Sequence, residues 1–550
     1  MPLRMNRLYY GDNLDVLRLY VADESVDLVY LDPPFNSNAS YNVLFAERDG
    51  AQAASQIKAF EDTWRWDEGA ARAFEEVVET GGSVSQAMQA FRALLGDTDM
   101  LAYLAMMAPR LVELRRVLKP TGSIYLHCDP TASHYLKLLL DAVFGPQHFR
   151  NEIAWKRTTA HSSARKFAPV HDVILYYGRS DRPTWNGPRT DYEPEYLDKY
   201  YKFDDGDRRL YWRADLCAAG VRHGSSGKEW RGINPTDKGM HWKFTVERLD
   251  ELDRQGRIYW PKRGTMPQYK RYRDELKGLS VPDMWDDIDR INPVGGERLG
   301  YPTQKPEALL VRIIEASSNP GEVVLDPFCG CGTAIAAAQK LNRQWIGIDI
   351  THLAITLIRS RLTDTFGGKA EYEVIGEPVS QPDAEALAVS DPYQFQWWAL
   401  GLVGARPVEQ KKGADKGIDG RIYFHEGPGQ TRQIILSVKA GKLHAPYVRD
   451  LRGVVEREKA VIGVLLTLDE PTKAMRTEAA SAGFYTSPWG KHPRLQILTV
   501  EDLLTGKTID RPPAQASATF KRAPRAKSPG AKAQALDFTA ESDDSAEDSS

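Results

Sequence analysis

The stretch Val323-Val-Leu-Asp-Pro-Phe-Cys-Gly-Cys-Gly-Thr333 determines the fold class of this chain. Its apolar start is typical of a short buried strand, and the glycines that follow predict a tight loop before a helix over 334–341. The apolar run from Trp345 to Asp349 predicts the next strand. A strand, a glycine loop, a helix and another strand in this order are typical of one half of a doubly wound, nucleotide-binding α/β sheet.

The same loop predicts a ligand. Gly330 and Gly332 let the backbone approach a bound molecule closely, and the N-terminus of the following helix offers unsatisfied N–H groups. Asp349 ends the next strand, where a carboxylate can accept hydrogen bonds from ribose hydroxyls. Asp326 opens the loop, and an acidic residue there suits a cation better than a phosphate. We expect a nucleotide-like cofactor with a cationic end, such as S-adenosyl-L-methionine; a tight turn that binds no ligand is the alternative.

A second string, Leu31-Asp-Pro-Pro-Phe-Asn36, follows the apolar run 26–31, which predicts a buried parallel strand. Methylation of an exocyclic amine requires that the nitrogen lone pair turn toward the methyl donor, and acceptors on the amino hydrogens achieve this. Asp32 supplies a carboxylate, Pro33 a carbonyl oxygen, and Phe35 an aromatic face for an extruded base. Pro33 and Pro34 fix the shape of the loop in advance. Taken alone, the string is also compatible with a simple turn after a strand.

Other segments complete an alternating α/β pattern, with helices expected over 101–118 and 135–144 and strands over 123–127 and 151–155. Residues 158–300 lose this pattern and are rich in Trp, Tyr, Gly and Arg, which predicts an inserted lobe. The expected domains are a catalytic half over 1–157, the lobe over 158–300, a cofactor-binding half over 301–375, a linker over 376–390, a second domain over 391–510 and a disordered tail over 511–550.

Composition excludes several classes of protein. The chain has 550 residues, which is too long for one core. Its net charge of −3 is too balanced to indicate a nucleic-acid partner. It contains no apolar run of roughly 18 residues and no P-loop, so neither a membrane protein nor an ATP-driven motor is expected. The start, Met1 to Tyr10, lacks the apolar region of a secretory signal, which favours the cytoplasm. Cys128 lacks the context of a cytosine C5 nucleophile, and we interpret it as structural.

The two strings and their surroundings resemble the β-group amino-methyltransferases of restriction–modification systems, close to the modification subunits of type III systems. The resemblance covers about residues 8–362. Its further elements are Tyr10 to Asn13, Gly122 to Asp129, Asn151 to Ile153 and Tyr301 to Pro306. It implies a Rossmann-like, S-adenosylmethionine-dependent methyltransferase sheet with an inserted target-recognition lobe, and double-stranded DNA as the substrate. No membrane association is implied; a homodimer and a separate restriction subunit are both open.

The resemblance also implies roles for individual residues. Catalysis is assigned to Asp32, Pro33, Pro34 and Phe35, and cofactor binding to Asp12, Thr303, Gln304, Lys305, Pro306, Asp326, Pro327, Phe328, Gly330, Gly332, Thr333 and Asp349. Cytosine N4 enzymes of the family more often begin the catalytic string with Ser, so Asp32 favours adenine N6. Methylation of cytosine N4 is the alternative.

The second domain resembles the Mrr-type nuclease core, an α/β fold of the PD-(D/E)xK class. The resemblance rests on Asp419 and on an apolar strand over 433–438 that leads through Ser437 into Lys439. In that core the Asp and a later acidic or Gln side chain bind a divalent metal such as Mg²⁺, which activates water. Ser437 departs from the pattern because a hydroxyl is a poorer Mg²⁺ ligand. An active nuclease fused to the methyltransferase and a domain kept only for DNA contact or packing are both open.

Overall fold

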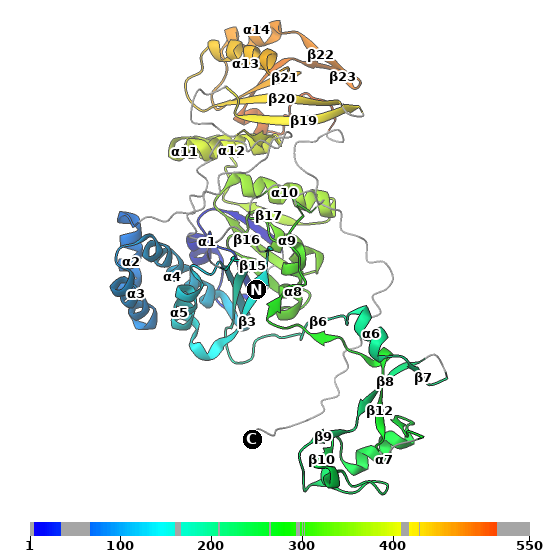
Figure 1. The fold of residues 1–550 in the computed structure, drawn as a ribbon. Helices are drawn as coiled ribbons and strands as arrows, with labels where there is room; N and C mark the ends of the chain where they lie inside the picture. The colour runs from blue at the N-terminus through cyan, green and yellow to red at the C-terminus, as the bar shows by residue number, and fades with distance from the viewer. Residues whose placement is uncertain are drawn as a thin grey trace. The chain divides into compact units, whose positions relative to one another are not determined.

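A computed structural model describes residues 5–34, 66–159, 167–206, 209–262, 266–292, 297–299, 301, 303–408, 417–427 and 430–513. The chain divides into two compact units. Unit 2 is Gly187–Pro282, and unit 1 comprises the residues before and after it. The two units are described separately below (Figure 1).

A nine-stranded sheet forms the centre of unit 1, in the order β14-β4-β5-β3-β2-β15-β16-β1-β17. The strands are β1 Asn6–Tyr10, β2 Val26–Leu31, β3 Leu118–Cys128, β4 Phe149–Lys156, β5 His171–Gly178, β14 Met284–Trp285, β15 Val323–Asp326, β16 Gln344–Asp349 and β17 Tyr372–Ile375. Only β5 runs antiparallel to the others among these nine. This sheet confirms the Rossmann-like fold expected from the sequence.

Helices cover both faces of this sheet. They are α1 Asn13–Tyr20, α2 Glu68–Glu79, α3 Gly82–Leu95, α4 Asp99–Val117, α5 Ser133–Phe144, α8 Glu307–Ser317, α9 Thr333–Lys340 and α10 His352–Phe366. Figure 1 shows α1, α4 and α5 on one face and α8 and α9 on the other. Every residue of β2 is buried, and its Val29 and Leu31 belong to the apolar core that α4 and α5 complete. A strand buried on both faces needs a continuous apolar run, which explains why the sequence predicted β2.

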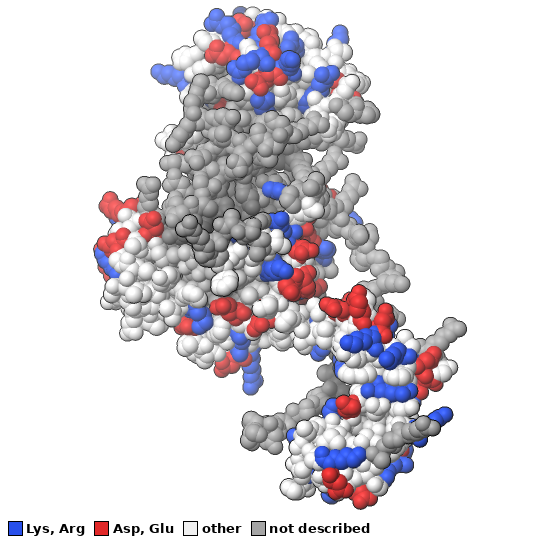
Figure 2. All heavy atoms as spheres, viewed as in Figure 1, with Lys and Arg blue, Asp and Glu red and all other residues white. Residues whose placement is uncertain are grey.

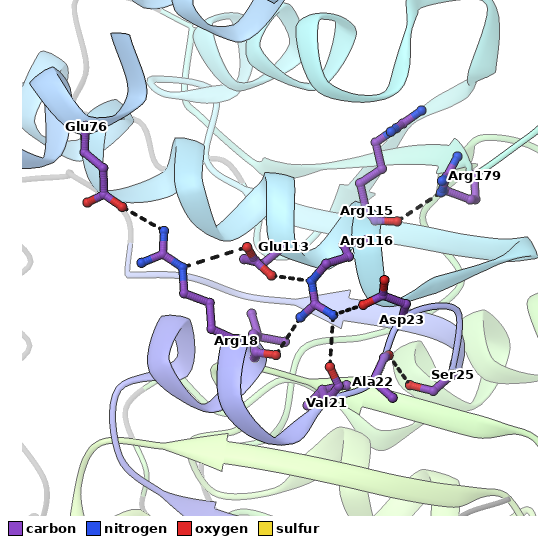
Figure 3. A network of polar contacts seen from close by, with 11 residues as sticks. Arg18, Val21, Ala22, Asp23, Ser25, Glu76, Glu113, Arg115, Arg116 and Arg179 are labelled. Carbon is purple, nitrogen blue, oxygen red and sulfur yellow. Dashed lines mark hydrogen bonds and ion pairs between the residues drawn. The ribbon is translucent and has the colours of Figure 1, made fainter. Parts of the chain in front are cut away.

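Arg116 near the end of α4 fixes the chain just before β2 (Figure 3). Its guanidinium donates to the Leu17 carbonyl oxygen at 2.7 Å and to that of Val21 at 3.1 Å, and it pairs with Asp23. Glu113 accepts from Arg116 Nε at 2.6 Å. These bonds supply partners for carbonyl groups at the end of α1, which a helix leaves unsatisfied. The start of β2 is thereby tied to α1 and α4.

Unit 2 contains a four-stranded sheet in the order β11-β12-β8-β7 and a small apolar core around Trp230 and Trp242. Its elements are β6 Arg189–Thr190, α6 Pro194–Tyr200, β7 Phe203–Asp204, β8 Leu210–Asp215, β9 Cys217–Ala219, β10 Met240–Trp242, α7 Val246–Arg254, β11 Ile258–Tyr259, β12 Gln268–Tyr272 and β13 Leu279–Ser280. The unit is narrower than the lobe expected over 158–300, because β5 and β14 pair with strands of the large sheet.

The C-terminal part of unit 1 has a five-stranded sheet in the order β18-β19-β20-β21-β24. Its elements are α11 Gln381–Ser390, α12 Pro392–Leu402, β18 Arg406–Pro407, β19 Gly420–Gly427, β20 Gln430–Lys439, α13 Pro446–Arg457, β21 Ile462–Thr467, α14 Lys473–Ser481, β22 Phe484–Ser487, β23 Gly490–Pro493, β24 Leu495–Thr499 and α15 Val500–Leu504. Residues 381–390, assigned above to a linker, form α11, whose N-cap Ser380 accepts from the Asp383 backbone N–H. Most of the expected tail, 514–550, lies outside the described residues. None of the helices in the described ranges is long and apolar enough to span a membrane.

Candidate active site

Three carboxylates lie at the carboxyl edge of the large sheet, where three adjacent parallel strands end. Asp32 follows β2, Asp326 is the last residue of β15, and Asp349 is the last residue of β16. Carboxyl ends of parallel strands in an open α/β sheet form the usual ligand-binding crevice. The fold therefore brings Asp32 close to two carboxylates that lie about three hundred positions later in the sequence.

Asp32 forms an ion pair with Lys305, whose Nζ lies 2.5 Å from Asp32 Oδ2. The two side chains are only 16% and 12% exposed, so the pair is held in a protected position. Pro33, the residue after Asp32, is buried, and Pro34 is half-buried. Phe35, expected to stack on the base, lies outside the described residues.

Asp326 and Asp349 are buried carboxyls close to other negative charges. Burial raises the pKa of Asp326 well above its usual range, and the nearby Asp32 and Asp349 carboxyls raise it further. Burial likewise raises the pKa of Asp349 to about 6, although backbone N–H groups at Thr351 and Gly330 act in the opposite direction. Asp349 accepts from Gly330 N at 2.9 Å and from Thr351 Oγ1 at 2.8 Å. This edge of the sheet therefore favours a positively charged ligand.

The glycine loop is shaped by close contacts that exclude side chains. Gly330 and Gly332 have positive φ values of 49° and 72°, which glycine tolerates best. A Cβ at Gly330 would lie 3.1 Å from the ring of Tyr301, and one at Gly332 would lie 2.8 Å from Ile358. Gly332 is also the N-cap of α9, so the helix N-terminus directly follows the loop. Both glycines are required by the shape of the loop.

The string 303–306 contributes one side chain to the Asp32 site and others to local structure. Lys305 pairs with Asp32 as described. Gln304 accepts from Leu299 N at 2.8 Å and donates to the Glu297 carbonyl at 2.8 Å, which holds its own loop together. Pro306 is buried and is the N-cap of α8. Thr303 is half-buried beside them.

Asp12 is the N-cap of α1, and its carboxylate accepts from Leu14 N at 2.7 Å and from Arg110 at 2.7 Å. Asn13, next to it, donates from Nδ2 to the Pro327 carbonyl at 2.8 Å and accepts from Arg110 Nε at 2.5 Å. Arg110 thus supports the glycine loop through Asn13. The sequence analysis included Asn13 in a family motif without giving it a role, and it missed Arg110, whose one available signal was a charged side chain inside a long apolar helix.

A buried polar chain crosses the sheet beside Asp32 and was also missed. Tyr30 OH lies 3.0 Å from His127 Nδ1, and His127 Nε2 lies 3.2 Å from Asp172 Oδ2. Burial lowers the pKa of His127, and the charge of Lys305 lowers it further. The three residues sit on β2, β3 and β5, so no local pattern in the sequence connects them.

In the C-terminal domain the carboxylate of Asp419 is hydrogen-bonded by neighbouring residues. Its carboxylate accepts from Val438 N at 2.7 Å, from Ser437 Oγ at 3.0 Å and from Gln396 Nε2 at 3.3 Å, and Lys439 Nζ lies 3.9 Å away. A carboxylate has about four acceptor positions, so most are used. In the parts of the chain that the structure describes, no group of three or more His, Cys, Asp or Glu side chains could hold a metal.

Residues 26–360 match the sequence family described as "DNA methylase", which comprises N6 and N4 enzymes. The chain belongs to this N6/N4 DNA methylase family. It is 32% identical over 358 residues to the type II methyltransferase M.EcaI of Enterobacter cloacae, covering 65% of this chain and 69% of the relative. It is 28% identical over 395 residues to the type III StyLTI Mod subunit of Salmonella typhimurium strain LT2, covering 68% of this chain and 55% of the relative. The expected kinship with restriction–modification methyltransferases is confirmed.

Solved structures resemble the methylase part more distantly. The M1.HpyAVI complex with SAM has 14% identity and a TM-score of 0.31, and covers 65% of this chain and 99% of that chain. The PvuII DNA methyltransferase, described as cytosine-N4-specific, has 13% identity and a TM-score of 0.32, and covers 64% of this chain and 84% of that chain.

The methylase chain carries a second match, over residues 394–505, to the family described as "NACHT-associated inactive Restriction Endonuclease 1". The expected restriction-endonuclease-like domain is therefore confirmed. The expected Mg²⁺ finds no support, because the matched family is described as inactive and Asp419 already has several protein partners.

Proposed function

We propose that this DNA methylase transfers a methyl group from S-adenosyl-L-methionine to N6 of adenine in double-stranded DNA. The observation that carries the proposal is the Asp32–Lys305 pair at the same sheet edge as the Asp326 and Asp349 carboxyls. Asp32, which can hold an amine, therefore lies next to the Asp326 and Asp349 carboxyls, which favour a cation.

The chemistry of the pocket fits the cofactor. Asp326 is buried, its pKa is raised, and the carboxyls of Asp32 and Asp349 add negative charge. Burial of a carboxylate is unfavourable unless a cation or hydrogen bonds compensate it. S-adenosyl-L-methionine carries a sulfonium and an ammonium, which would supply that compensation. Cofactor binding is assigned to Asp326 and the loop up to Thr333, to the neighbouring Thr303, and to Asp349 for the ribose.

The residues of the chain position the amine. The carboxylate of Asp32 and the carbonyl oxygen of Pro33 would accept hydrogen bonds from the two amino hydrogens, which turns the nitrogen lone pair toward the donor. Lys305 fixes the orientation of the Asp32 carboxylate. When bound, the cofactor supplies an electrophilic methyl group. As the new N–C bond forms and the S–C bond breaks, the nitrogen loses a proton, and Asp32 is placed to accept it.

Adenine is preferred to cytosine because the catalytic string begins with Asp32. In the resembling family the cytosine N4 enzymes more often have Ser at this position. Residues 158–300 would select the target sequence. The protein must hold the duplex around a flipped base, and contacts to that duplex can read the sequence.

Asp32→Ala tests the assignment. We expect methyl transfer to fall by at least about 10²-fold, because the amine loses an acceptor that is needed in the transition state. Binding of S-adenosyl-L-methionine, measured by calorimetry, should remain within a few fold of the wild type. Mass analysis of nucleosides from DNA treated with the wild type should show N6-methyladenine. N4-methylcytosine would overturn the adenine assignment, and undiminished transfer by Asp32→Ala would overturn the catalytic one.

A further inference from the structure

Arg213 lies at the centre of the four-stranded sheet of unit 2, on β8, with its guanidinium between two aromatic rings. Its central carbon is 3.6 Å from the ring centroid of Phe203 and 3.7 Å from that of Tyr259. The rings belong to β7 and β11, the two edge strands of this sheet. The plane of the guanidinium is therefore fixed from both sides.

Two neighbouring cations that contact aromatic rings in this unit have acidic partners. Lys270, directly opposite Arg213 in the strand register, donates to Asp205 at 2.6 Å. Arg209, stacked 4.0 Å from the Tyr272 ring centroid, donates to Asp274 at 2.7 Å. Arg213 has no ion pair or hydrogen bond through its side chain to any residue that the structure describes, and its Nε is buried without a partner.

A purely structural role explains the stacking but not the missing partner. Cation–π contacts stabilise an arginine between rings. A buried N–H without an acceptor is unfavourable, and an apolar side chain of similar size would fill the same space without that cost. The buried Nε is out of reach of a ligand, but the two terminal nitrogens of Arg213 are not among the buried atoms without a partner. Their unpaired charge and fixed geometry indicate that a ligand supplies acceptors to these two nitrogens.

Arginine presents its donors in a planar fork that matches two acceptors side by side. In the major groove of DNA, O6 and N7 of guanine form such a pair, and Arg–guanine is the commonest specific contact. Figure 2 shows Lys and Arg side chains of unit 2 interleaved with Asp and Glu on the visible face, without a continuous basic patch. This pattern favours recognition of a base over general attraction to phosphates.

We propose that Arg213 is a specificity-determining residue that reads a guanine in the target DNA. The proposal rests on the function proposed above, since it requires that unit 2 contact the methylated duplex. The two rings hold the guanidinium in one orientation, so little side-chain freedom is lost when the contact forms.

The test expresses the full chain in a host that lacks N6 and N4 methylation and maps the modified bases by sequencing. We expect the wild-type motif to contain a guanine whose requirement is relaxed in Arg213→Lys and Arg213→Gln, with methylation of the original motif reduced by a factor on the order of 10 to 100. The matched control is Arg209→Lys, which alters an arginine that is also stacked on a ring but already paired with carboxylates; its motif should be unchanged. Melting curves of the purified variants check folding.

The outcomes separate the two proposals. If the DNA of cells that express the wild-type protein carried no modified bases, the proposed function would be overturned and, with it, the role of Arg213. An unchanged motif in both folded Arg213 variants would overturn the inference alone. A uniform loss over all sites, with no position relaxed, would make Arg213 a phosphate contact and would also overturn the base-reading role.

Discussion

Asp349 shows how burial of a single carboxyl couples the site to pH. Burial raises its pKa to about 6, above the value of about 3.9 expected in an unfolded chain. Between these two values the folded state binds more protons than the unfolded state, so the free energy of unfolding decreases as pH rises from about 4 to 6. The decrease amounts to about 3 kcal/mol. A bound cation would compensate the ionised form, which is the form present at neutral pH.

The pH dependence of cofactor binding tests this point. We expect the dissociation constant of S-adenosyl-L-methionine to be constant above pH 7 and to increase below about pH 6, approaching tenfold per pH unit, because the ribose hydroxyls lose an ionised acceptor when Asp349 is protonated. Calorimetry from pH 5 to 8 measures it. In Asp349→Asn the affinity should be weaker throughout, and the transition near pH 6 should disappear. A wild-type affinity that stays flat from pH 5 to 7 would contradict the expectation.

At the scale of elements, the sequence predicted strands that are buried on both faces and missed contacts between distant elements. β2, β15 and β16 are short, mostly apolar runs, so their type and position could be read directly. The bond from Asn13 to the Pro327 carbonyl joins residues 314 positions apart. No periodicity encodes such a pair, because it depends on which strands become neighbours.

Asn13→Asp isolates this contact between α1 and the glycine loop, to which cofactor binding is assigned above. The carboxylate would keep its bond with Arg110 but would have no N–H to donate to the Pro327 carbonyl. We expect cofactor affinity to fall about tenfold, which corresponds to a loss of about 1.4 kcal/mol, whereas turnover at saturating cofactor changes little. Calorimetry and steady-state kinetics measure the two effects.

Asp15→Asn, which removes an exposed carboxylate on the same helix, is the control. Its carboxylate is in the first turn of α1 and makes no bond to Pro327. If Asn13→Asp bound cofactor as tightly as the control, the loop would not depend on α1.

The whole molecule joins a methylase with a restriction-endonuclease-like domain whose acidic site is altered. The sequence indicated the kinship through Asp419 and Lys439, and Ser437 already cast doubt on metal binding. The structure adds Gln396 on α12 as a further partner of Asp419. A sequence could not show this pairing because α12 and the residue that precedes β19 are brought together only by the tertiary fold. Asp419 therefore has the surroundings of a structural carboxylate.

This interpretation predicts that the full chain leaves plasmid DNA uncut in Mg²⁺, with or without S-adenosyl-L-methionine. Asp419→Asn should then affect stability and not chemistry. The N–H of Val438 and the hydroxyl of Ser437 donate to the same oxygen of Asp419, whereas Gln396 donates to the other. The amide keeps only one oxygen, so its NH₂ group faces a donor where the second oxygen was, at a cost of about 1–3 kcal/mol. Denaturant melting of the wild type and of Asp450→Asn, an exposed carboxyl on α13, provides the comparison. Methylation by both variants should match the wild type. Metal-dependent cleavage by the wild type that disappears in Asp419→Asn would instead show that the domain is an active nuclease.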